Sequence, residues 1–251
     1  MKFFNTKNKL LSKLIAGVLV LTAFLPTVQA VKPKPKPEPQ TANEYLVDAV
    51  RSGSIMLAYL ALKNGATNVN DALWELCEYK YKGEINTVGM AEFLLERGAD
   101  VNARDEYDRT LLQVLCDHRP SDYRLVEFLI EHGADVNVCD CYGVTPLMCA
   151  CRAGAKDTAE ILLNHGARIN ERSQYGDTAL IYAAYYNNGD TVGVVKLLLE
   201  CGASVNLCTY DKKRSAVYYA VDNVLHLDKN SPEDVDQAKE VLRLLIEAGA
   251  K

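Results

Sequence analysis

Eight cysteines give this 251-residue chain its most obvious chemical potential. Four of them, Cys139, Cys141, Cys149 and Cys151, form a C-x-C-x7-C-x-C string. Four thiolates at such close spacing could surround a zinc ion. In an exported protein, cysteines can instead pair as disulfides. Which chemistry is possible depends on the elements that position these thiols.

The segment around Cys149 and Cys151 favours a helix over a metal-binding loop. Thr145 is a capping residue type, Pro146 suits the first helical position, and Gly154 ends the pattern. Residues two apart on a helix point about 200° away from each other, so Cys149 and Cys151 cannot both face one ion. The sequence therefore predicts no metal site, although one close pair of other thiols could still oxidise.

The remaining residue types give no indication of catalysis. The four histidines, His118, His132, His165 and His226, fall on predicted turns or helix ends. His132 and His165 each precede a Gly-Ala pair, where a polar or cationic side chain favourably faces a helix C-terminus. No Ser-His-acid order, glycine-rich phosphate loop or paired-carboxylate pocket stands out. We therefore predict that the chain is not an enzyme and needs no cofactor.

A Gly-Ala pair recurs after a helical pattern six times along the chain. The pairs begin at Gly65, Gly98, Gly133, Gly166, Gly202 and Gly249, with spacings of 33, 35, 33, 36 and 47 residues. Four of them are followed by Val101-Asn102, Val136-Asn137, Ile169-Asn170 and Val205-Asn206, and three are preceded by Leu94-Leu95, Leu162-Leu163 and Leu198-Leu199. One such unit cannot bury its own apolar face, so the period indicates a stacked repeat protein.

These motifs resemble the ankyrin repeat, a β-hairpin followed by two antiparallel helices. The resemblance implies an all-α repeat solenoid of about six repeats in one curved stack. The predicted units cover residues 42–70, 71–103, 104–138, 139–171, 172–207 and 208–251. The last unit is long because of an insertion at 222–236, between helices expected at 215–221 and 237–247. This insertion is either a binding loop or a tolerated surface insertion.

The register of the units separates the cysteines into two groups. Cys77, Cys116 and Cys151 occupy one position of three successive units, where the family has a small alanine between helices. Equivalent positions in neighbouring repeats lie about 10 Å apart, whereas a disulfide needs Cα atoms within about 7 Å. We predict that these three thiols are buried, together with Cys149. The thiols predicted to lie nearer the surface are Cys139, Cys141, Cys201 and Cys208.

The N-terminus is predicted to be an export signal. Residues 1–30 carry four lysines and no acid, an apolar run at 14–25 and a Val28-Gln29-Ala30 ending. This pattern is typical of a signal peptide cleaved after Ala30. The alternative is an uncleaved anchor, but the apolar run is shorter than the roughly 20 residues that span a bilayer. We expect an exported bacterial protein, periplasmic or secreted, with no stable membrane span after processing.

Residues 31–41 separate this signal from the repeat domain, which is predicted to occupy 42–251. They begin VKPKPKPEPQ, and alternating prolines and charged residues predict an extended linker. Such segments also serve as ligands for aromatic grooves, so a recognition role is the alternative.

The charge of the repeats restricts the class of partner. The chain contains 28 basic and 33 acidic residues, and the repeats alone carry 21 basic and 32 acidic residues, a net charge of −11. This surface would repel a nucleic-acid backbone. It suits a partner protein with a basic surface.

A column of tyrosines marks a candidate binding surface. Aligned hairpins place Tyr107, Tyr142 and Tyr175 at one fingertip position, with Tyr210 close to it. The ends of the first helices on the same concave side carry Asp117, Arg152, Tyr185 and Asp222. Tyrosine offers a large, rigid contact area and recurs at interface hot spots. The alternative is that the fingertip tyrosines only pack on neighbouring hairpins.

The resemblance implies a scaffold for protein–protein interaction that binds through hairpin tips and the concave helix face. One hypothesis is an exported adaptor or inhibitor that holds another protein in the cell envelope. A second is a secreted factor that acts on host or competitor proteins. A third is a thiol- or metal-dependent envelope protein that uses the surface cysteines.

Overall fold

The computed structural model of the chain describes residues 39–78, 86–118, 122–186, 188–211, 213–226 and 232–250. The chain divides into two parts, Met1–Glu38 and Pro39–Lys251, and all described residues belong to the second. The predicted signal peptide at 1–30 and residues 31–38 of the predicted linker lie outside the described residues. Residues 39–41, also assigned to the linker, begin the first helix instead.

Twelve helices lie within these described ranges and form six pairs. The pairs are α2 (Pro39–Arg51) with α3 (Ile55–Lys63), α4 (Val69–Glu78) with α5 (Thr87–Leu95), α6 (Leu111–Asp117) with α7 (Tyr123–Glu131), α8 (Pro146–Ala153) with α9 (Lys156–Asn164), α10 (Ala179–Tyr186) with α11 (Thr191–Glu200), and α12 (Ala216–His226) with α13 (Pro232–Glu247). Each predicted unit thus supplies one helix pair, which confirms the all-α repeat solenoid.

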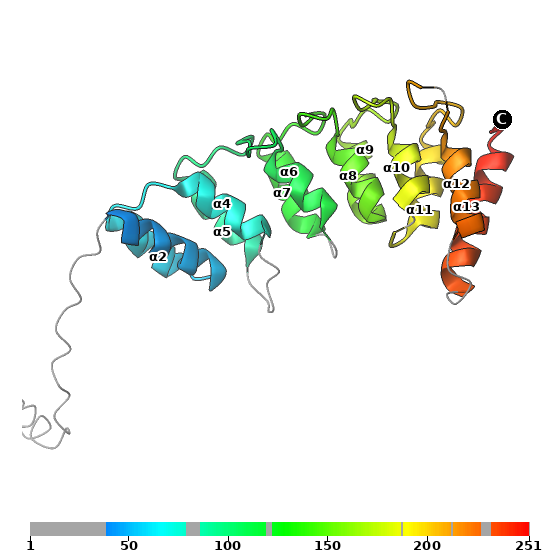
Figure 1. Ribbon diagram of the computed structural model, residues 1–251. Coiled ribbons are helices and arrows are strands. Elements are labelled where there is room, and N and C mark those ends of the chain that lie inside the picture. The colour runs from blue at the N-terminus through cyan, green and yellow to red at the C-terminus, as the bar shows by residue number, and fades with distance from the viewer. Residues whose placement is uncertain are drawn as a thin grey trace, which may run out of the picture. The chain divides into compact units, whose positions relative to one another are not determined.

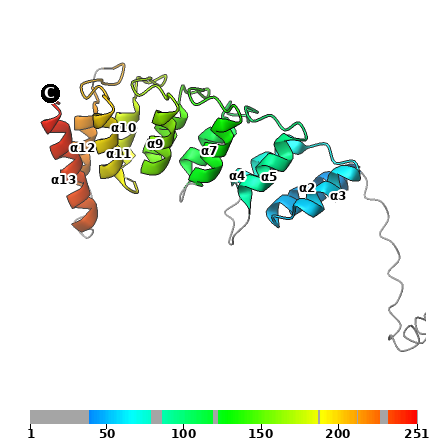
Figure 2. The same cartoon turned by 180° about the vertical axis from the view of Figure 1, so that it is seen from behind.

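The pairs stack so that the helices form two rows. Each first helix packs against the first helix of the next pair, from α2 to α12, and each second helix does the same from α3 to α13. The stacking can be followed in Figures 1 and 2, which view the same part of the chain from opposite sides. The connections between successive pairs run along one edge of the stack, at the top of Figure 1.

These connections form tight turns rather than β-strands in the part of the chain that the structure describes. Only two isolated antiparallel bridges occur there, Arg104 with Thr110 and Cys208 with Ser215. The predicted hairpins are therefore reduced to one bridge or none. Their arms are too short for a ladder, because each is drawn almost at once into the helix that follows.

The helix ends predicted from sequence are confirmed at α8. The Thr145 hydroxyl accepts the amide hydrogen of Met148 at 3.3 Å, and Pro146 is the first helical residue. Gly154 ends the helix with φ of +63°, a left-handed conformation that favours glycine. A side chain at this position would also be blocked, since an added Cβ would lie 1.8 Å from the carbonyl oxygen of Asn188. The turn at Gly154 in the fourth unit therefore packs directly against the backbone of Asn188 in the fifth unit.

Asparagines of the Val-Asn motif tie neighbouring units together. In the third unit, Asn137 Oδ1 accepts the amide hydrogen of Arg168 at 2.8 Å and Asn137 Nδ2 donates to the Gly166 carbonyl at 3.1 Å. Asn102 makes the same two bonds one unit earlier, to Asp135 at 3.0 Å and Gly133 at 3.0 Å. The repeated asparagine therefore satisfies backbone groups at the C-terminal end of the next unit's second helix.

The core lies between the two rows of helices. Its largest fully buried side chains include Leu112, Leu147, Leu162 and Leu180, one or more from each central unit. Leu163, which was grouped with Leu162 on sequence, is only half-buried. Cys116, Cys149 and Cys151 lie in the same core with exposures of 0%, 4% and 1%. The predicted burial of these three thiols is confirmed, whereas the side chain of Cys77 falls outside the described residues.

The structure corrects the helix bounds that were predicted on either side of the insertion at 222–236. Residues 222–226 extend α12 to His226, and residues 232–236 form the first turns of α13, so most of the segment is helical rather than an irregular loop. Asn223 explains part of this extension, because its Nδ2 donates to the Ala184 carbonyl at 2.7 Å and to the Tyr185 carbonyl at 3.3 Å. Those carbonyls belong to the last turn of α10, which would otherwise lack partners there.

Candidate functional site

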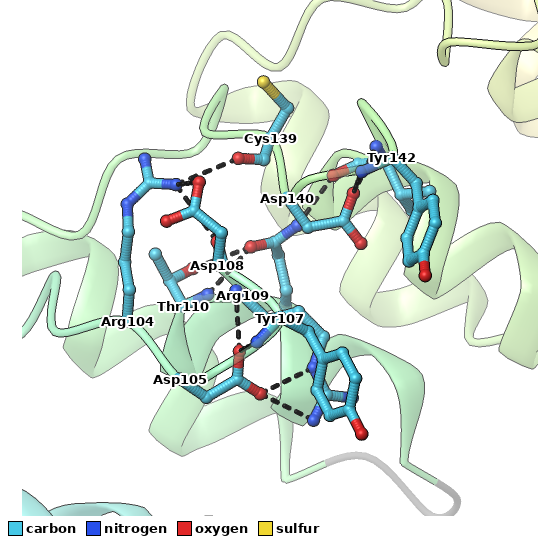
Figure 3. A network of polar contacts seen from close by, with 11 residues as sticks. Arg104, Asp105, Tyr107, Asp108, Arg109, Thr110, Cys139, Asp140 and Tyr142 are labelled. Carbon is cyan, nitrogen blue, oxygen red and sulfur yellow. Dashed lines mark hydrogen bonds and ion pairs between the residues drawn. The ribbon is translucent and has the colours of Figure 1, made fainter.

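The fingertip turns are built by one polar side chain at the start of each turn. Asp105 Oδ1 accepts the amide hydrogens of Tyr107 at 2.9 Å and Arg109 at 2.8 Å. Asp140 makes the equivalent pair of bonds to Tyr142 at 2.9 Å and Val144 at 2.8 Å. This is the side-chain turn chemistry expected of aspartate, and it sets the backbone of each tyrosine. Figure 3 shows these two turns, which begin at Asp105 and Asp140.

Electrostatics strengthens the first of these turns. Burial alone would raise the pKa of Asp105, but hydrogen bonds from the Arg109 backbone and guanidinium and from the Tyr107 amide hold that pKa below its ordinary value. The guanidinium of Arg109 lies 2.7 Å from Asp105 Oδ2 and 5.3 Å from the centre of the Tyr107 ring. Asp105 therefore stays ionised, and the Tyr107 ring has a cation beside it.

Neighbouring tips are joined through their backbones. The Tyr107 carbonyl accepts from the Cys141 amide at 3.3 Å, the Tyr142 carbonyl accepts from the Gln174 amide at 2.9 Å, and the Tyr175 carbonyl accepts from the Tyr210 amide at 3.0 Å. Each column tyrosine thus sits at a junction between two units. These hydrogen bonds between units fix the backbone positions of the column tyrosines.

Two arginines that sequence reasoning did not single out reinforce these junctions. Arg104 Nη1 donates to the Cys139 carbonyl of the next tip at 3.1 Å and to Asp108 Oδ2 at 2.7 Å (Figure 3). Arg172 occupies the equivalent position in the turn of the fifth unit, and it likewise donates to the Cys208 carbonyl of the following tip. Arginine at this turn position therefore bridges to the following tip.

The column tyrosines are exposed on this rigid edge. Tyr107, Tyr142, Tyr175 and Tyr210 expose between 47% and 60% of their surface. In Figure 3 the Tyr107 and Tyr142 rings project from adjacent tips toward the same side. Tyr210 has a second contact, because the Arg172 guanidinium lies 4.3 Å from its ring centre. Packing on neighbouring turns accounts for part of each ring and leaves the rest available.

The four predicted helix-end residues do not act as one group. Arg152 Nε donates to Asp117 Oδ1 at 2.8 Å, so these two charges offset each other across α6 and α8. Asp222 lies 3.0 Å from His226 Nδ1 on its own helix. Tyr185 is different, since its ring packs 4.6 Å from the ring of Tyr186 and 4.6 Å from that of Tyr219.

Tyr185 belongs to a tyrosine cluster that sequence reasoning missed. Tyr182 stacks on Tyr186 with ring centres 5.9 Å apart, and Tyr218 meets Tyr219 edge-on at 5.4 Å. The signal in the sequence was the presence of a Tyr-Tyr pair in each of two successive first helices, at 185–186 near the end of α10 and at 218–219 near the start of α12. The rings therefore recur on the first helices of successive units and meet between α10 and α12.

A pocket of about 350 Å³ opens beside this cluster. It is lined by Tyr175, Asp177, Ile181, Tyr182, Tyr185, Tyr186, Arg214 and Tyr219. Burial raises the pKa of Tyr219 and that of Tyr182, so both hydroxyls stay neutral even above the ordinary tyrosine pKa of about 10. Tyr175 of the fingertip column and Tyr185 of the helix-end residues both line the pocket, so one member of each predicted group lies there.

The thiols behave as two groups, largely as their register predicts. Burial raises the pKa of Cys149 to about 12, and burial likewise raises the pKa values of Cys116 and Cys151 above the ordinary range. Cys139, Cys141 and Cys201 are exposed, and Cys208 is half-buried. Within the described residues, no three or more His, Cys, Asp or Glu side chains gather in a way that could hold a metal ion.

Two of the four histidines, His132 and His165, cap the C-terminal ends of helices. His132 is the C-cap of α7, where its Nδ1 lies 2.8 Å from the Phe128 carbonyl oxygen and its ring stacks on Phe128 at 4.0 Å. His165 is the C-cap of α9. The predicted position of both at helix C-termini is confirmed.

A helix long and apolar enough to cross a membrane does not occur among the described helices.

Comparison with known proteins bears on the repeats directly. Profiles of ankyrin repeats match residues 83–173 and residues 149–199. The crystal structure of an ankyrin repeat domain from Acinetobacter baumannii AYE is similar to this chain, with 26% sequence identity and a TM-score of 0.63, over 83% of this chain and 100% of that one. Curated protein sequences gave no significant match. Residues 83–199 of this chain therefore match ankyrin repeats in sequence, and the described residues have the fold of an ankyrin repeat domain.

Proposed function

We propose that this chain is a scaffold that binds a partner protein along the fingertip column and the adjoining tyrosine pocket. Ankyrin repeats generally mediate protein–protein interactions and are typically not enzymes, and we propose no catalytic role. The observation that carries the proposal is the row of half-exposed tyrosines on a backbone fixed by inter-unit hydrogen bonds. Rigid aromatic side chains contribute binding energy at a low entropic cost.

The acidic balance of the repeats supports a partner with a basic surface. A net charge of −11 attracts such a surface at long range and raises the association rate. The test is capture of partners from the native envelope fraction with wild type and with Tyr142→Ala in parallel, followed by mass spectrometry. A specific partner is one that wild type retains and the variant loses. Equal capture of every protein by both forms would contradict the proposed surface.

Export of this scaffold is part of the proposal. Its support is the charged, apolar and small-residue order of residues 1–30, which is typical of a cleaved signal. We propose that the mature protein begins at Val31 and acts in the cell envelope as an adaptor or inhibitor. N-terminal sequencing of the exported protein should read from Val31. An intact Met1 in a membrane fraction would establish an anchor instead.

A secreted factor that acts on host or competitor proteins is the second candidate function. The same export pattern favours it, and fractionation separates it from the envelope adaptor, because the protein would then accumulate in the medium. The exposed thiols of Cys139, Cys141 and Cys201 keep a thiol-dependent role as a third candidate. A thiol titration together with metal analysis of the purified protein tests that role.

A further inference from the structure

The tyrosine pocket has walls that are fixed before any ligand arrives. Tyr182, Tyr186, Tyr185 and Tyr219 form a continuous chain of ring contacts, with successive ring centres 5.9, 4.6 and 4.6 Å apart. Asn223 fixes the two helices relative to each other by bonding the last carbonyls of α10 from α12. The walls are therefore preorganised, which lowers the entropic cost of binding.

The ring faces of this cluster already lie beside a cation within the chain. The Arg152 guanidinium is 6.0 Å from the centre of Tyr182 and 5.9 Å from that of Tyr186. Its charge is offset by Asp117, whose Oδ1 lies 2.8 Å from Arg152 Nε. Tyrosine faces carry a partial negative charge that attracts ammonium and guanidinium groups. The two most exposed rings of the lining, Tyr175 and Tyr185, offer the same chemistry to an incoming group.

One carboxylate lines the pocket with the rings. Asp177 is half-buried between the fifth fingertip and α10, and its burial raises its pKa above the ordinary value despite the nearby Arg214 and a hydrogen bond from Ser173. The surroundings thus only partly compensate its negative charge. A second positive group placed in the pocket would complete that compensation.

Among the described residues of the lining, Arg214 is the one arginine, and it already has partners. Arg214 hydrogen-bonds the Tyr219 hydroxyl and lies 3.7 Å from Asp211 Oδ2. Because the carboxylates of Asp211 and Asp177 offset its charge, it offers less to an anionic ligand than an unpaired arginine would. The lining therefore favours a cation over an anion, in agreement with the net acidic charge of the repeats.

We propose that the tyrosine pocket binds the charged end of a lysine or arginine side chain from the partner protein, with the cation against the tyrosine rings and beside Asp177. This inference rests on the proposed function, since it names the class of partner residue that the scaffold recognises. The side chain would enter next to Tyr175, so a partner segment lying along the fingertips could place it there.

The test uses two small probes of the same shape and different charge. N-acetyl-arginine amide carries the guanidinium, and N-acetyl-citrulline amide replaces it with a neutral urea group. The full-length protein with isotope-labelled tyrosine rings is titrated with each, and ring resonances are followed by NMR. We expect the arginine probe to shift the pocket resonances and to bind at least about tenfold more tightly than the citrulline probe.

Variants locate the binding. Asp177→Asn and Tyr185→Ala should each weaken the arginine probe several-fold, whereas Tyr59→Ala, on the exposed face of α3, should leave it unchanged. Circular dichroism melts show whether each variant is folded. Equal binding of both probes, tighter binding of N-acetyl-glutamate amide, or full binding in both pocket variants would overturn the proposal.

The outcomes for the pocket and for the scaffold are separable. If Tyr142→Ala loses the captured partner but the arginine probe does not bind, the scaffold stands and the cation pocket is wrong. If the probe binds as expected but the fingertip variants retain every partner, the pocket stands and the fingertip surface is wrong.

Discussion

At the scale of single residues, the environment of each thiol decides its reactivity. The thiolate is the reactive form, so a buried cysteine whose pKa is raised is both inaccessible and uncharged at neutral pH. Register predicted this for Cys116 and Cys151 because the repeat places them at a buried alanine position. The exposed positions could also be predicted, since they fall on turns and helix ends.

The first prediction is that the two groups of thiols differ in alkylation. Native protein treated with iodoacetamide should be labelled at Cys139, Cys141 and Cys201 and protected at Cys116, Cys149 and Cys151, which burial shields. Peptide mapping by mass spectrometry reads the result, and denatured protein is the control in which all become labelled. Native labelling of Cys116 at the rate of Cys139 would show that the assigned packing is wrong.

Asp177 provides a prediction about pH. Its pKa is raised in the folded state by burial, so the folded protein holds this proton more tightly than the unfolded chain does. The stability that this proton contributes is full below the unfolded pKa and is lost as pH rises through the folded pKa. Asp177→Asn cannot ionise, so its melting temperature relative to wild type should rise as the pH increases from below the ordinary aspartate pKa of about 3.9 to neutral pH.

Thermal melts of both proteins across that range measure the difference. A relative melting temperature that falls as pH rises would mean that attraction to Arg214 outweighs burial. The sequence could not have indicated this environment, because Asp177 acquires it only when α10, α12 and two turns come together.

At the scale of elements, the caps and period were predictable and the junctions were not. Thr145, Pro146 and Gly154 mark α8 in the sequence because their chemistry is local. Asn137 also stood out in the repeated motif, but its bonds to the next unit depend on the stacking. The extension of α12 to His226 was missed for the same reason, since Asn223 has its partners on α10.

Two glycines of the fourth unit end helices at two kinds of turn, and an alanine substitution at each can be compared. Gly154→Ala places a Cβ 1.8 Å from the Asn188 carbonyl oxygen, whereas Gly166→Ala meets nothing within 4 Å, although both glycines have positive φ. Gly166→Ala should cost about 1–2 kcal/mol for the left-handed backbone alone. Gly154→Ala should cost clearly more, because the fifth unit's turn must also move.

Chemical denaturation of both variants measures these costs. Equal costs would mean that the segment around Asn188 yields freely and that the fourth and fifth units are not fixed to each other at this turn. The bond from the Asp190 amide to the Gly154 carbonyl, 3.1 Å long, argues against such freedom.

At the scale of the whole molecule, the family and the repeat count were predictable and the working surface was only partly so. Six in-phase motifs fix the solenoid because each unit needs its neighbours to bury its apolar face. The fingertip tyrosines could be aligned from the same period. Pairing of Asp117 with Arg152 could not, because the two side chains meet only across adjacent helices. The export signal at residues 1–30 lies outside the described ranges and stays a prediction.

The central claim is that the fingertip tyrosines bind a partner and do not serve the fold. The most direct measurement compares partner affinity and melting temperature side by side for Tyr107→Ala, Tyr142→Ala and Tyr175→Ala. Leu162→Ala, at a fully buried position, is the control that should cost about 2–5 kcal/mol of stability. The three tyrosine variants should stay within about 0.5 kcal/mol of wild-type stability.

Their affinity for the captured partner should fall by about 1–3 kcal/mol each, since truncating a central aromatic anchor commonly costs that much. The association rate should also fall as salt is added, because the repeats are acidic. Weakened binding with unchanged melting is the predicted result. Normal binding with early melting in all three variants would contradict it, and would make the column a packing feature of the stack.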